Sequence, residues 1–419
     1  MTTNYEFTSA FVDRRFDDEC DFLAEIVKVP SDNPPGDCEP SSRRVRELLA
    51  GLGLEVEVHP VPADAVRANG MISATNLVVR QRFGSGTGPV IALNAHGDVV
   101  PPGQGWTHDP YGAEIVNDPQ HGPTMYGRGV AVSKSDFATY TFALLALREL
   151  TTSGAKLNGA IELQLTWDEE AGGEIGPRWL LEQGLSQATL AISAGFSYGV
   201  TTAHNGCLHL EVIVHGKQGH AAMPERGVDA IAAATQILSA IYASREALKA
   251  RKSQTPGIVH PTLNVGLIQG GINTNVVPDR VSFRIDRRII PEESPAAAED
   301  ELRALIGAEA AKIPGITIEI RRILLSLPLV RLPGADKLIA ALQARGKEIF
   351  GAEIAEHGVP IYTDARHYTT AGIPAVLYGA GPRTLAEANG HAADENLRLE
   401  DLRRATKVVA TALADLLSG

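Results

Sequence analysis

The order of hydrophobic patterns along the chain constrains its fold more than any other feature. Helical and strand patterns alternate up to about residue 193, and this alternation predicts a largely parallel sheet with helices on both faces. Between residues 208 and 320 the order becomes strand, helix, strand, strand, helix, strand, which is typical of a split βαβ unit. The predicted fold class is therefore α/β, with a doubly wound domain in two parts, residues 1–206 and 324–419, and an inserted α+β domain over residues 207–323.

The composition indicates a globular protein with a sizeable core. The chain has 419 residues, 44% of them hydrophobic, which suits two or three domains. Its net charge of −12, without a basic cluster, predicts no nucleic-acid partner, and no apolar run is long enough to cross a membrane. The first 21 residues do not resemble a signal peptide. Cys20, Cys38 and Cys207 are odd in number and widely spaced, which predicts reduced thiols in a cytoplasmic protein and argues against a cysteine-based zinc site.

A histidine and an aspartate follow a buried strand in the first third of the chain. The apolar run from Pro89 to Leu93 leads into His96, Gly97 and Asp98, and a Pro-Pro-Gly turn follows. Open α/β sheets place their ligands at such strand ends. His96 could bind a divalent metal, and Asp98 could accept the other ring N–H and fix the tautomer. Taken alone, however, a histidine beside an aspartate in a turn is more often structural.

Three acidic residues follow a second apolar strand. Asp168, Glu169 and Glu170 come directly after the strand predicted over residues 160–166 and precede a Gly-Gly turn. One of two adjacent carboxylates at a strand end can bind a metal while its neighbour acts as general base. The alternative interpretation is a solvated acidic loop.

Polar loops elsewhere supply further candidates. His391 lies in a glycine-bounded loop, where Asp394 and Glu395 are predicted to cap the terminal helix. His220 lies on a glycine-rich loop of the inserted domain, where an imidazole could donate to a developing oxyanion. Asn275 lies in a polar turn that suits substrate contacts and equally suits a plain hairpin. Each histidine, taken alone, is better explained as an ordinary loop residue.

Together these segments resemble the aminoacylase, carboxypeptidase-G and succinyl-diaminopimelate desuccinylase family of metallopeptidases. The matching motifs occur in the family's order and cover nearly the whole chain. They are His-Gly-Asp-Val-Val-Pro at 96–101, Gly-Trp-Thr-His-Asp-Pro at 105–110, Tyr-Gly-Arg-Gly at 126–129, Asp-Glu-Glu at 168–170, Gly-Lys-Gln-Gly-His at 216–220, Gly-Gly-x-x-x-Asn-x-x-Pro at 270–278, Thr-Asp-Ala-Arg at 363–366 and Gly-His at 390–391.

The resemblance implies a zinc-peptidase-like catalytic domain carrying a ferredoxin-like lid that often forms a dimer. It implies His96 as a ligand of one metal, oriented by Asp98, and Glu170 and His391 as ligands of the other. It also implies Glu169 as general base and His220 as the group that polarises the scissile carbonyl, often from the partner subunit. The residues that it implies for holding a substrate carboxylate are Asn275, Arg287 or Arg288, and Arg366.

The sequence departs from this family at two expected metal ligands. Lys134 fixes the alignment of the Gly-Arg-Gly motif, so Val132 stands where a bridging aspartate is expected. The second acid is also absent, because the turn after residues 190–193 reads Ala194-Gly195-Phe-Ser. A bridging carboxylate lets two metal ions lie ~4 Å apart. We therefore predict one ion rather than two, held by His96, Glu170 and His391, unless Asp136 swings in as a replacement ligand.

These observations predict a metal-dependent hydrolase of a C–N bond in a small carboxylate-bearing substrate, such as an N-acyl amino acid or a dipeptide. The expected metal is zinc, with manganese or cobalt as alternatives, and two His with one Glu is a known mononuclear zinc ligand set. A homodimer through the inserted domain is expected. The alternatives are a metal-independent member with other acid–base chemistry, and a protein that only binds a small molecule.

Overall fold

The structure is a computed structural model that describes residues 3–119 and 121–418. The chain divides into two compact units. The first comprises the residues up to Thr202, Arg331–His357 and the residues from Thr363 onward, and the second comprises Ala203–Val330 with Gly358–Tyr362. The sequence placed the boundaries at 206/207 and 323/324, a few residues inside this second unit. It did not anticipate that the short segment Gly358–Tyr362 joins the second unit.

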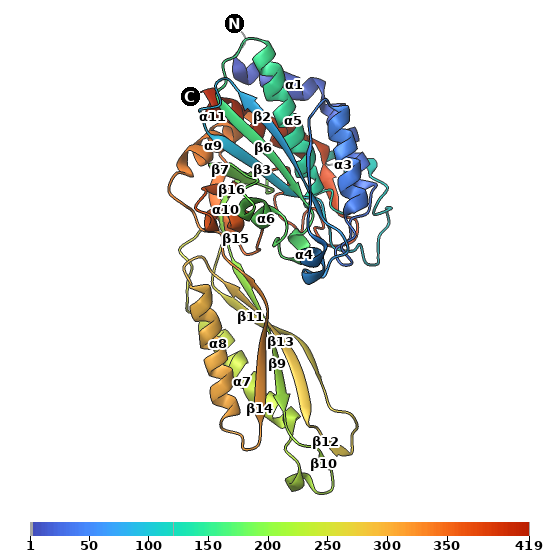
Figure 1. The fold of residues 1–419 in the computed structure, drawn as a ribbon, viewed down its shortest axis with the longest axis vertical. Coiled ribbons are helices and arrows are strands. Elements are labelled where there is room, and N and C mark those ends of the chain that lie inside the picture. Colours follow the sequence, from blue (N-terminus) through green and yellow to red (C-terminus); the bar gives the residue numbers. More distant parts are fainter. Residues whose placement is uncertain (1–2, 120, 419) are drawn as a thin grey trace. The chain divides into compact units, whose positions relative to one another are not determined.

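The first unit is built on an eight-stranded sheet (Figure 1) with the order β1-β2-β6-β3-β7-β16-β8-β15. Parallel pairing holds β6 to β3, β3 to β7 and β7 to β16, whereas β1–β2, β2–β6 and β16–β8 pair antiparallel. The predicted parallel sheet is therefore confined to the centre. The strands are β1 (Glu57–Pro60), β2 (Thr75–Phe83), β3 (Val90–His96), β6 (Gly159–Thr166), β7 (Leu190–Ser193), β8 (Gly199–His204), β15 (Ala355–Val359) and β16 (Ala375–Leu377).

Helices and a small sheet complete this unit. A separate three-stranded antiparallel sheet has the order β17-β5-β4, with β4 (Glu114–Asp118), β5 (Gly122–Tyr126) and β17 (Asn396–Arg398). The helices are α1 (Asn4–Arg14), α2 (Phe16–Val27), α3 (Glu39–Gly51), α4 (Ala63–Ala68), α5 (Lys134–Thr152), α6 (Pro177–Glu182), α9 (Asp336–Phe350), α10 (Ala365–Thr370) and α11 (Leu399–Ser418), with a 3-10 turn η1 (Glu169–Ala171).

Helix α5 lies at the centre of the core. It packs against α1, α2 and α11, and Phe142 on α5 meets Phe22 edge to face at a centroid distance of 6.0 Å. Both rings are almost fully buried, and burying an aromatic side chain of this size contributes about 2–3 kcal/mol. The beginning of α5, directly after the Gly-Arg-Gly motif, is buried as well. The core therefore fixes the segment that carries Val132 and Lys134.

The second unit has the ferredoxin-like arrangement that the sequence predicted. Its antiparallel sheet has the order β11-β13-β9-β14 (Figure 1), so β9 and β13 are central while β11 and β14 form the edges. Alternate residues of β9, such as Leu208 and Leu210, pack against the helices, so the intervening residues lie on the other face. The elements are β9 (Gly206–His215), α7 (Ala230–Leu248), β11 (Thr262–Gly270), β13 (Arg280–Ile289), α8 (Pro295–Ala310) and β14 (Thr317–Ser326), with the ribbon β10 (Gly219–His220) and β12 (Val276–Val277) and the 3-10 turn η2 (Pro224–Arg226).

Candidate active site

Two neighbouring parallel strands bring the first candidate residues together. His96 ends β3 and Thr166 ends β6, and these two residues are partners in the parallel ladder. The acidic run Asp168 to Glu170 begins two residues after Thr166, so it meets His96 at the same edge of the sheet. One ligand-type atom from each of His96, Glu169 and Glu170 lies within 4.8 Å of the others. This edge of the central sheet is therefore the candidate site.

Asp98 is the residue that organises this edge. Its Oδ1 lies 3.3 Å from His96 Nδ1, which also lies 3.0 Å from the Asp98 carbonyl oxygen. Its carboxylate accepts the backbone N–H of Glu169 at 3.2 Å and that of Glu170 at 3.0 Å. Asn33 Nδ2 donates to Oδ2 at 2.9 Å. One buried carboxylate thus occupies the Nδ1 side of His96 and fixes the turn that carries both glutamates, which leaves Nε2 of His96 as the metal-facing nitrogen.

Burial and neighbouring charges shift the pKa values of the groups at this edge. Burial alone would lower the pKa of His96, but the hydrogen bond to Asp98 and the neighbouring carboxylates raise it well above its usual value. Burial raises the pKa of Glu169 to about 8. His391 lies at the rim, with Nε2 3.3 Å from Glu170 Oε1, and this contact raises its pKa despite partial burial. A buried group of carboxylates around imidazoles has the donor types and the charge that suit a divalent cation.

Four residues at this edge are therefore candidates to bind a metal ion. Among the described residues, the compact group is His96, Glu169 and Glu170, while His391 contacts this group through Glu170. The set predicted from the sequence, His96, Glu170 and His391, is thus brought to one place. Because Glu170 contacts His391 and lies within 4.8 Å of His96, it connects the two imidazoles.

The positions of the two expected but absent acids are also informative. Val132 donates its backbone N–H to Glu395 Oε1 at 3.1 Å, and its side chain offers no ligand atom. Asp136, which the sequence offered as a replacement, is buried in the first turn of α5. Its oxygens accept the backbone N–H of Ala380 at 2.7 Å and of Gly195 at 3.2 Å. Its carboxylate is thus engaged by strand-end amides, and it is not a member of the compact group.

The loop from Asp394 to Glu395 corrects one prediction. The sequence suggested that both residues cap the terminal helix, but Asp394 accepts the backbone N–H of Thr107 at 2.8 Å and of His108 at 3.2 Å. Glu395 is fully buried and pairs with Arg128 Nη1 at 2.7 Å. Both carboxylates therefore bind segments far away in the sequence. They hold the loop of His391 against the Gly-Arg-Gly segment.

For three buried residues behind the site, the sequence predicted either no role or a role that differs from the one in the structure. Arg366, predicted to bind substrate, is 2% exposed and donates to the carbonyl oxygens of Thr363, at 2.7 Å, and of Gly172. It therefore supports the loop after Glu170. Asp168 accepts the N–H of Ile175 at 2.6 Å, and burial raises its pKa well above the usual value. Asp364 is a second buried carboxylate, and the Thr-Asp-Ala-Arg motif was the sequence signal that could have found it.

The candidates in the second unit fall into two groups. His220 on β10 pairs with Val276 on β12, and the carbonyl oxygen of Asn275 accepts the N–H of Ala221 at 3.1 Å, so His220 and Asn275 are neighbours. Both are exposed. Arg287 and Arg288 lie near the other end of the sheet, where β13 pairs with the start of β9.

The two arginines differ in what they contact. Arg287 is 3% exposed, and its Nη2 is held by Glu293 Oε1 at 2.7 Å. Arg288 lies on the opposite face and donates to both oxygens of Asp286, at 3.0 and 3.1 Å. Its guanidinium also stacks over Tyr362, 5.8 Å from the ring centroid. Arg288 is therefore the better placed of the two to contact a ligand, since its side chain is 29% exposed and that of Arg287 is 3% exposed.

Comparison with known proteins places this geometry in a family. The profile of peptidase family M20/M25/M40 matches residues 92–415. The chain is 29% identical over 353 residues to an acetylornithine deacetylase of Myxococcus xanthus, covering 83% of this chain and 86% of that protein. A solved di-peptidase structure from Saccharomyces cerevisiae is similar with a TM-score of 0.77, at 14% identity and 100% coverage of both chains. A metallo-carboxypeptidase of the M20 family from Sulfolobus solfataricus is similar with a TM-score of 0.75, at 19% identity, covering 96% of this chain and 99% of that one.

The family match spans well over half of the chain and includes His96, Glu169, Glu170 and His391. The structural neighbours share the whole fold, the catalytic domain and the inserted domain together. None of the described helices is long and apolar enough to cross a membrane. The chain belongs to peptidase family M20/M25/M40, and it is a hydrolase that acts on C–N bonds.

Proposed function

We propose that this protein hydrolyses the amide bond of a small carboxylate-bearing substrate, such as an N-acyl amino acid or a dipeptide. The observation that supports this proposal most is the group of His96, Glu169 and Glu170 at the ends of β3 and β6. It combines an imidazole with two carboxylates at the sheet edge where α/β enzymes bind ligands. The similarity to acetylornithine deacetylases makes N-acetylornithine the first substrate to test.

Glu169 is the proposed general base. Burial raises its pKa to about 8, so the carboxylate is basic enough to accept a proton from an attacking water near neutral pH. The same group can return that proton to the leaving amine. His220 is the proposed donor to the developing oxyanion, because the Nδ1 of its exposed ring accepts the backbone N–H of Ala222 at 3.1 Å, which leaves Nε2 as the nitrogen that can donate.

We propose that His96, Glu170 and His391 hold one divalent ion, with zinc first and manganese or cobalt as alternatives. A bound ion of this kind supplies Lewis acidity next to the scissile carbonyl. Asp98 keeps the proton of His96 on Nδ1, so Nε2 remains available. We expect one ion because Val132 offers no bridging carboxylate and Asp136 is engaged by backbone amides.

We also propose a homodimer that shares its sites between subunits. Arg288 pairs with Cys207 at the start of β9 (Gly206–His215), whereas His220 follows the far end of that strand. Eight residues of strand cover about 26 Å, far more than a small amide can bridge. A site that uses both residues therefore needs His220 and Asn275 from a second copy. The exposed side chains of Leu267, Ile268 and Ile272, at 60%, 60% and 69%, offer an apolar edge for that contact.

Mixing two inactive variants tests the shared site. Glu169→Gln and His220→Ala are each expected to be inactive as homodimers. After subunit exchange, about a quarter of the sites would carry both intact residues if His220 acts across the dimer. Recovered turnover supports the arrangement, and its absence in a verified heterodimer contradicts it.

The chemistry is tested with metal-free protein to which zinc, manganese or cobalt is returned, using N-acetylornithine, other N-acyl amino acids and dipeptides. Glu169→Gln should lower kcat about 10²–10⁴-fold while metal content stays unchanged. Glu182→Gln, on the exposed face of α6, is the matched control. Turnover without any metal would favour other acid–base chemistry, and binding without turnover would favour a binding protein.

Three cysteines without a disulfide also support our proposal of a cytoplasmic location.

A further inference from the structure

A second cluster of ligand-type side chains lies on the sheet of the second unit. Cys207 and His209 are two residues apart on β9, so both project from the face opposite the helices. Asp286 on β13 pairs directly with His209, and Arg288 pairs with Cys207. Directly opposed residues of antiparallel strands project to the same side. The backbone register therefore gathers a thiol, an imidazole and a carboxylate on one small area of the sheet.

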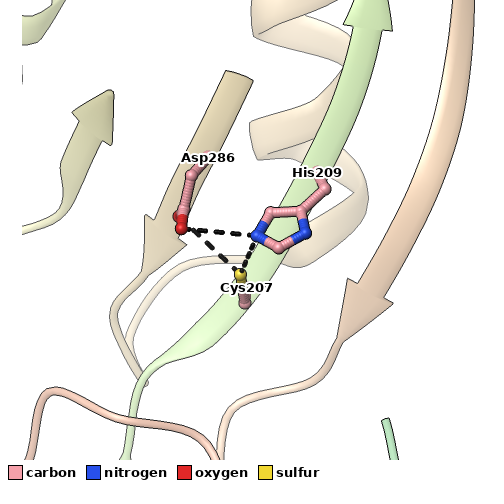
Figure 2. A group of neighbouring side chains, drawn as sticks. All are labelled: Cys207, His209 and Asp286. Atoms are coloured by element: carbon pink, nitrogen blue, oxygen red, sulfur yellow. Dashed lines mark hydrogen bonds and ion pairs between the residues drawn. The ribbon is translucent and has the colours of Figure 1, made fainter. Parts of the chain in front are cut away.

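The three side chains converge on a common point (Figure 2). Cys207 Sγ lies 3.2 Å from His209 Nε2 and 3.7 Å from Asp286 Oδ1, and His209 Nε2 lies 3.3 Å from Asp286 Oδ2. In a catalytic relay the thiol and the carboxylate contact opposite nitrogens of the ring. Here both contact the same nitrogen. The three side chains are therefore arranged like the ligands of a metal ion. They are not arranged like a catalytic nucleophile and its general base.

The spacing agrees with a tetrahedral metal. Zinc bonds of about 2.3 Å to sulfur and about 2.0–2.1 Å to nitrogen and oxygen give ligand–ligand distances of about 3.4–3.6 Å. The observed distances of 3.2, 3.3 and 3.7 Å bracket these values. Thiolate, imidazole and carboxylate are also the donor types that zinc accepts together.

The surroundings supply the support that metal ligands need. Arg288 donates to both oxygens of Asp286, which orients the carboxylate and leaves lone pairs on each oxygen. Ser326 on β14 is the cross-strand partner of Cys207 and is 0% exposed. Its Oγ has no hydrogen-bond partner among the described residues, so it faces the same area with an unused polar atom.

We infer that Cys207, His209 and Asp286 form a second metal site, for zinc or another divalent ion that prefers thiolate and imidazole. None of the three ligands belongs to the candidate active site, and the inference does not depend on the proposed reaction, although Arg288, a proposed substrate contact, also holds Asp286. The ion would connect β9 to β13 and leave a fourth position beside Ser326. The sequence argued against a cysteine-based zinc site because its cysteines are far apart, but the strand register supplies the other ligands from neighbouring positions.

Cobalt binding to the metal-free, full-length protein tests this site directly. A thiolate ligand gives cobalt(II) an intense charge-transfer absorption in the near ultraviolet, and no candidate ligand of the active site carries sulfur. We expect this band to saturate at one equivalent per chain and to disappear when zinc is added. Total bound metal should fall by one equivalent in Cys207→Ser.

Matched variants separate the outcomes. Cys38→Ala removes another buried thiol and should keep the band, because burial holds the pKa of that thiol far above its usual range. Glu170→Gln disturbs the active site and should also keep it. His209→Gln serves where Cys207→Ser fails to fold, and it should weaken cobalt binding at least tenfold. A wild-type protein without the band, or a band that persists in Cys207→Ser, overturns the inference. Alkylation of Cys207 in the metal-free protein that proceeds at the same rate after excess zinc is added would also overturn the inference.

Discussion

Asp98→Asn is the most informative single substitution in the candidate active site. The side chain keeps its shape but exchanges one acceptor oxygen for an NH₂ group. In the native protein, Oδ1 contacts the backbone N–H of Glu169 and His96 Nδ1, and Oδ2 accepts from Glu170 and Asn33. Whichever side the NH₂ group takes, it faces a backbone N–H that can only donate. The substitution therefore leaves a donor unsatisfied in either orientation.

The expected magnitude follows from these contacts. A buried backbone N–H without an acceptor costs about 1–3 kcal/mol of stability. If the NH₂ group faces His96 Nδ1, that nitrogen keeps the Asp98 carbonyl oxygen, 3.0 Å away, as its acceptor but loses the carboxylate charge beside the ring. Loss of such an orienting carboxylate typically weakens metal binding about 10–100-fold. We expect both effects together, a loss of stability and a loss of metal affinity.

Two measurements on the same samples check this prediction. Chemical denaturation of the metal-free protein gives the stability loss, and competition with a chelator gives the metal affinity. Glu162→Gln is the matched control, because Glu162 is another buried carboxylate of this sheet, held by Gln164, Ser186 and Gln187. It should lose stability but keep metal affinity. If Asp98→Asn binds metal as tightly as the wild type, the orienting role of Asp98 is wrong.

Three further predictions concern other parts of the chain. Burial raises the pKa of Glu19 to about 8, so the folded state favours the protonated carboxyl and the stability of the protein falls as the pH rises from about 5 to about 8. Over that pH range, Glu19→Gln should gain up to about 1.4 kcal/mol of stability per pH unit relative to the wild type. Denaturation at several pH values measures this gain, and a difference that stays constant with pH would contradict the prediction. Asp136→Asn should leave metal content unchanged, since backbone amides occupy its oxygens; elemental analysis showing a lost ion would make it a ligand. Val132→Asp should raise the metal content of the candidate active site from one to two equivalents, measured against Cys207→Ser as background, and unchanged content would refute the proposed alignment.

The order of elements could be predicted because it depends on local patterns. The change from α/β alternation to strand, helix, strand, strand, helix, strand identified the second unit and its ferredoxin-like sheet. The antiparallel pairing of β1, β2 and β8 within the large sheet was not predicted. Pairing direction depends on which strands become neighbours, and a hydrophobic run reads similarly in either orientation.

The strand-end candidates could be predicted for a related reason. His96 and the run from Asp168 to Glu170 each follow an apolar strand directly, so parallel pairing of those strands brings them together. The roles of Glu395 and Arg366 could not be predicted in this way. Glu395 contacts Arg128 across 267 positions of sequence, and Arg366 contacts Gly172 across 194. Only the folded chain shows that these charges support loops, because nothing in their local sequence distinguishes a structural charge from a ligand contact.

The charge around His96 gives a physical reason for one metal ion. Two dications 4 Å apart repel each other by about 17 kcal/mol at an effective dielectric constant of 20, and a bridging carboxylate normally offsets much of this. Of the three carboxylates nearest His96, Asp98 is engaged by three N–H donors and by His96. Glu169 is needed as a base, which leaves Glu170 as the one acidic ligand. Glu170 alone would therefore have to offset the repulsion between two ions, which supports the proposal of a single ion.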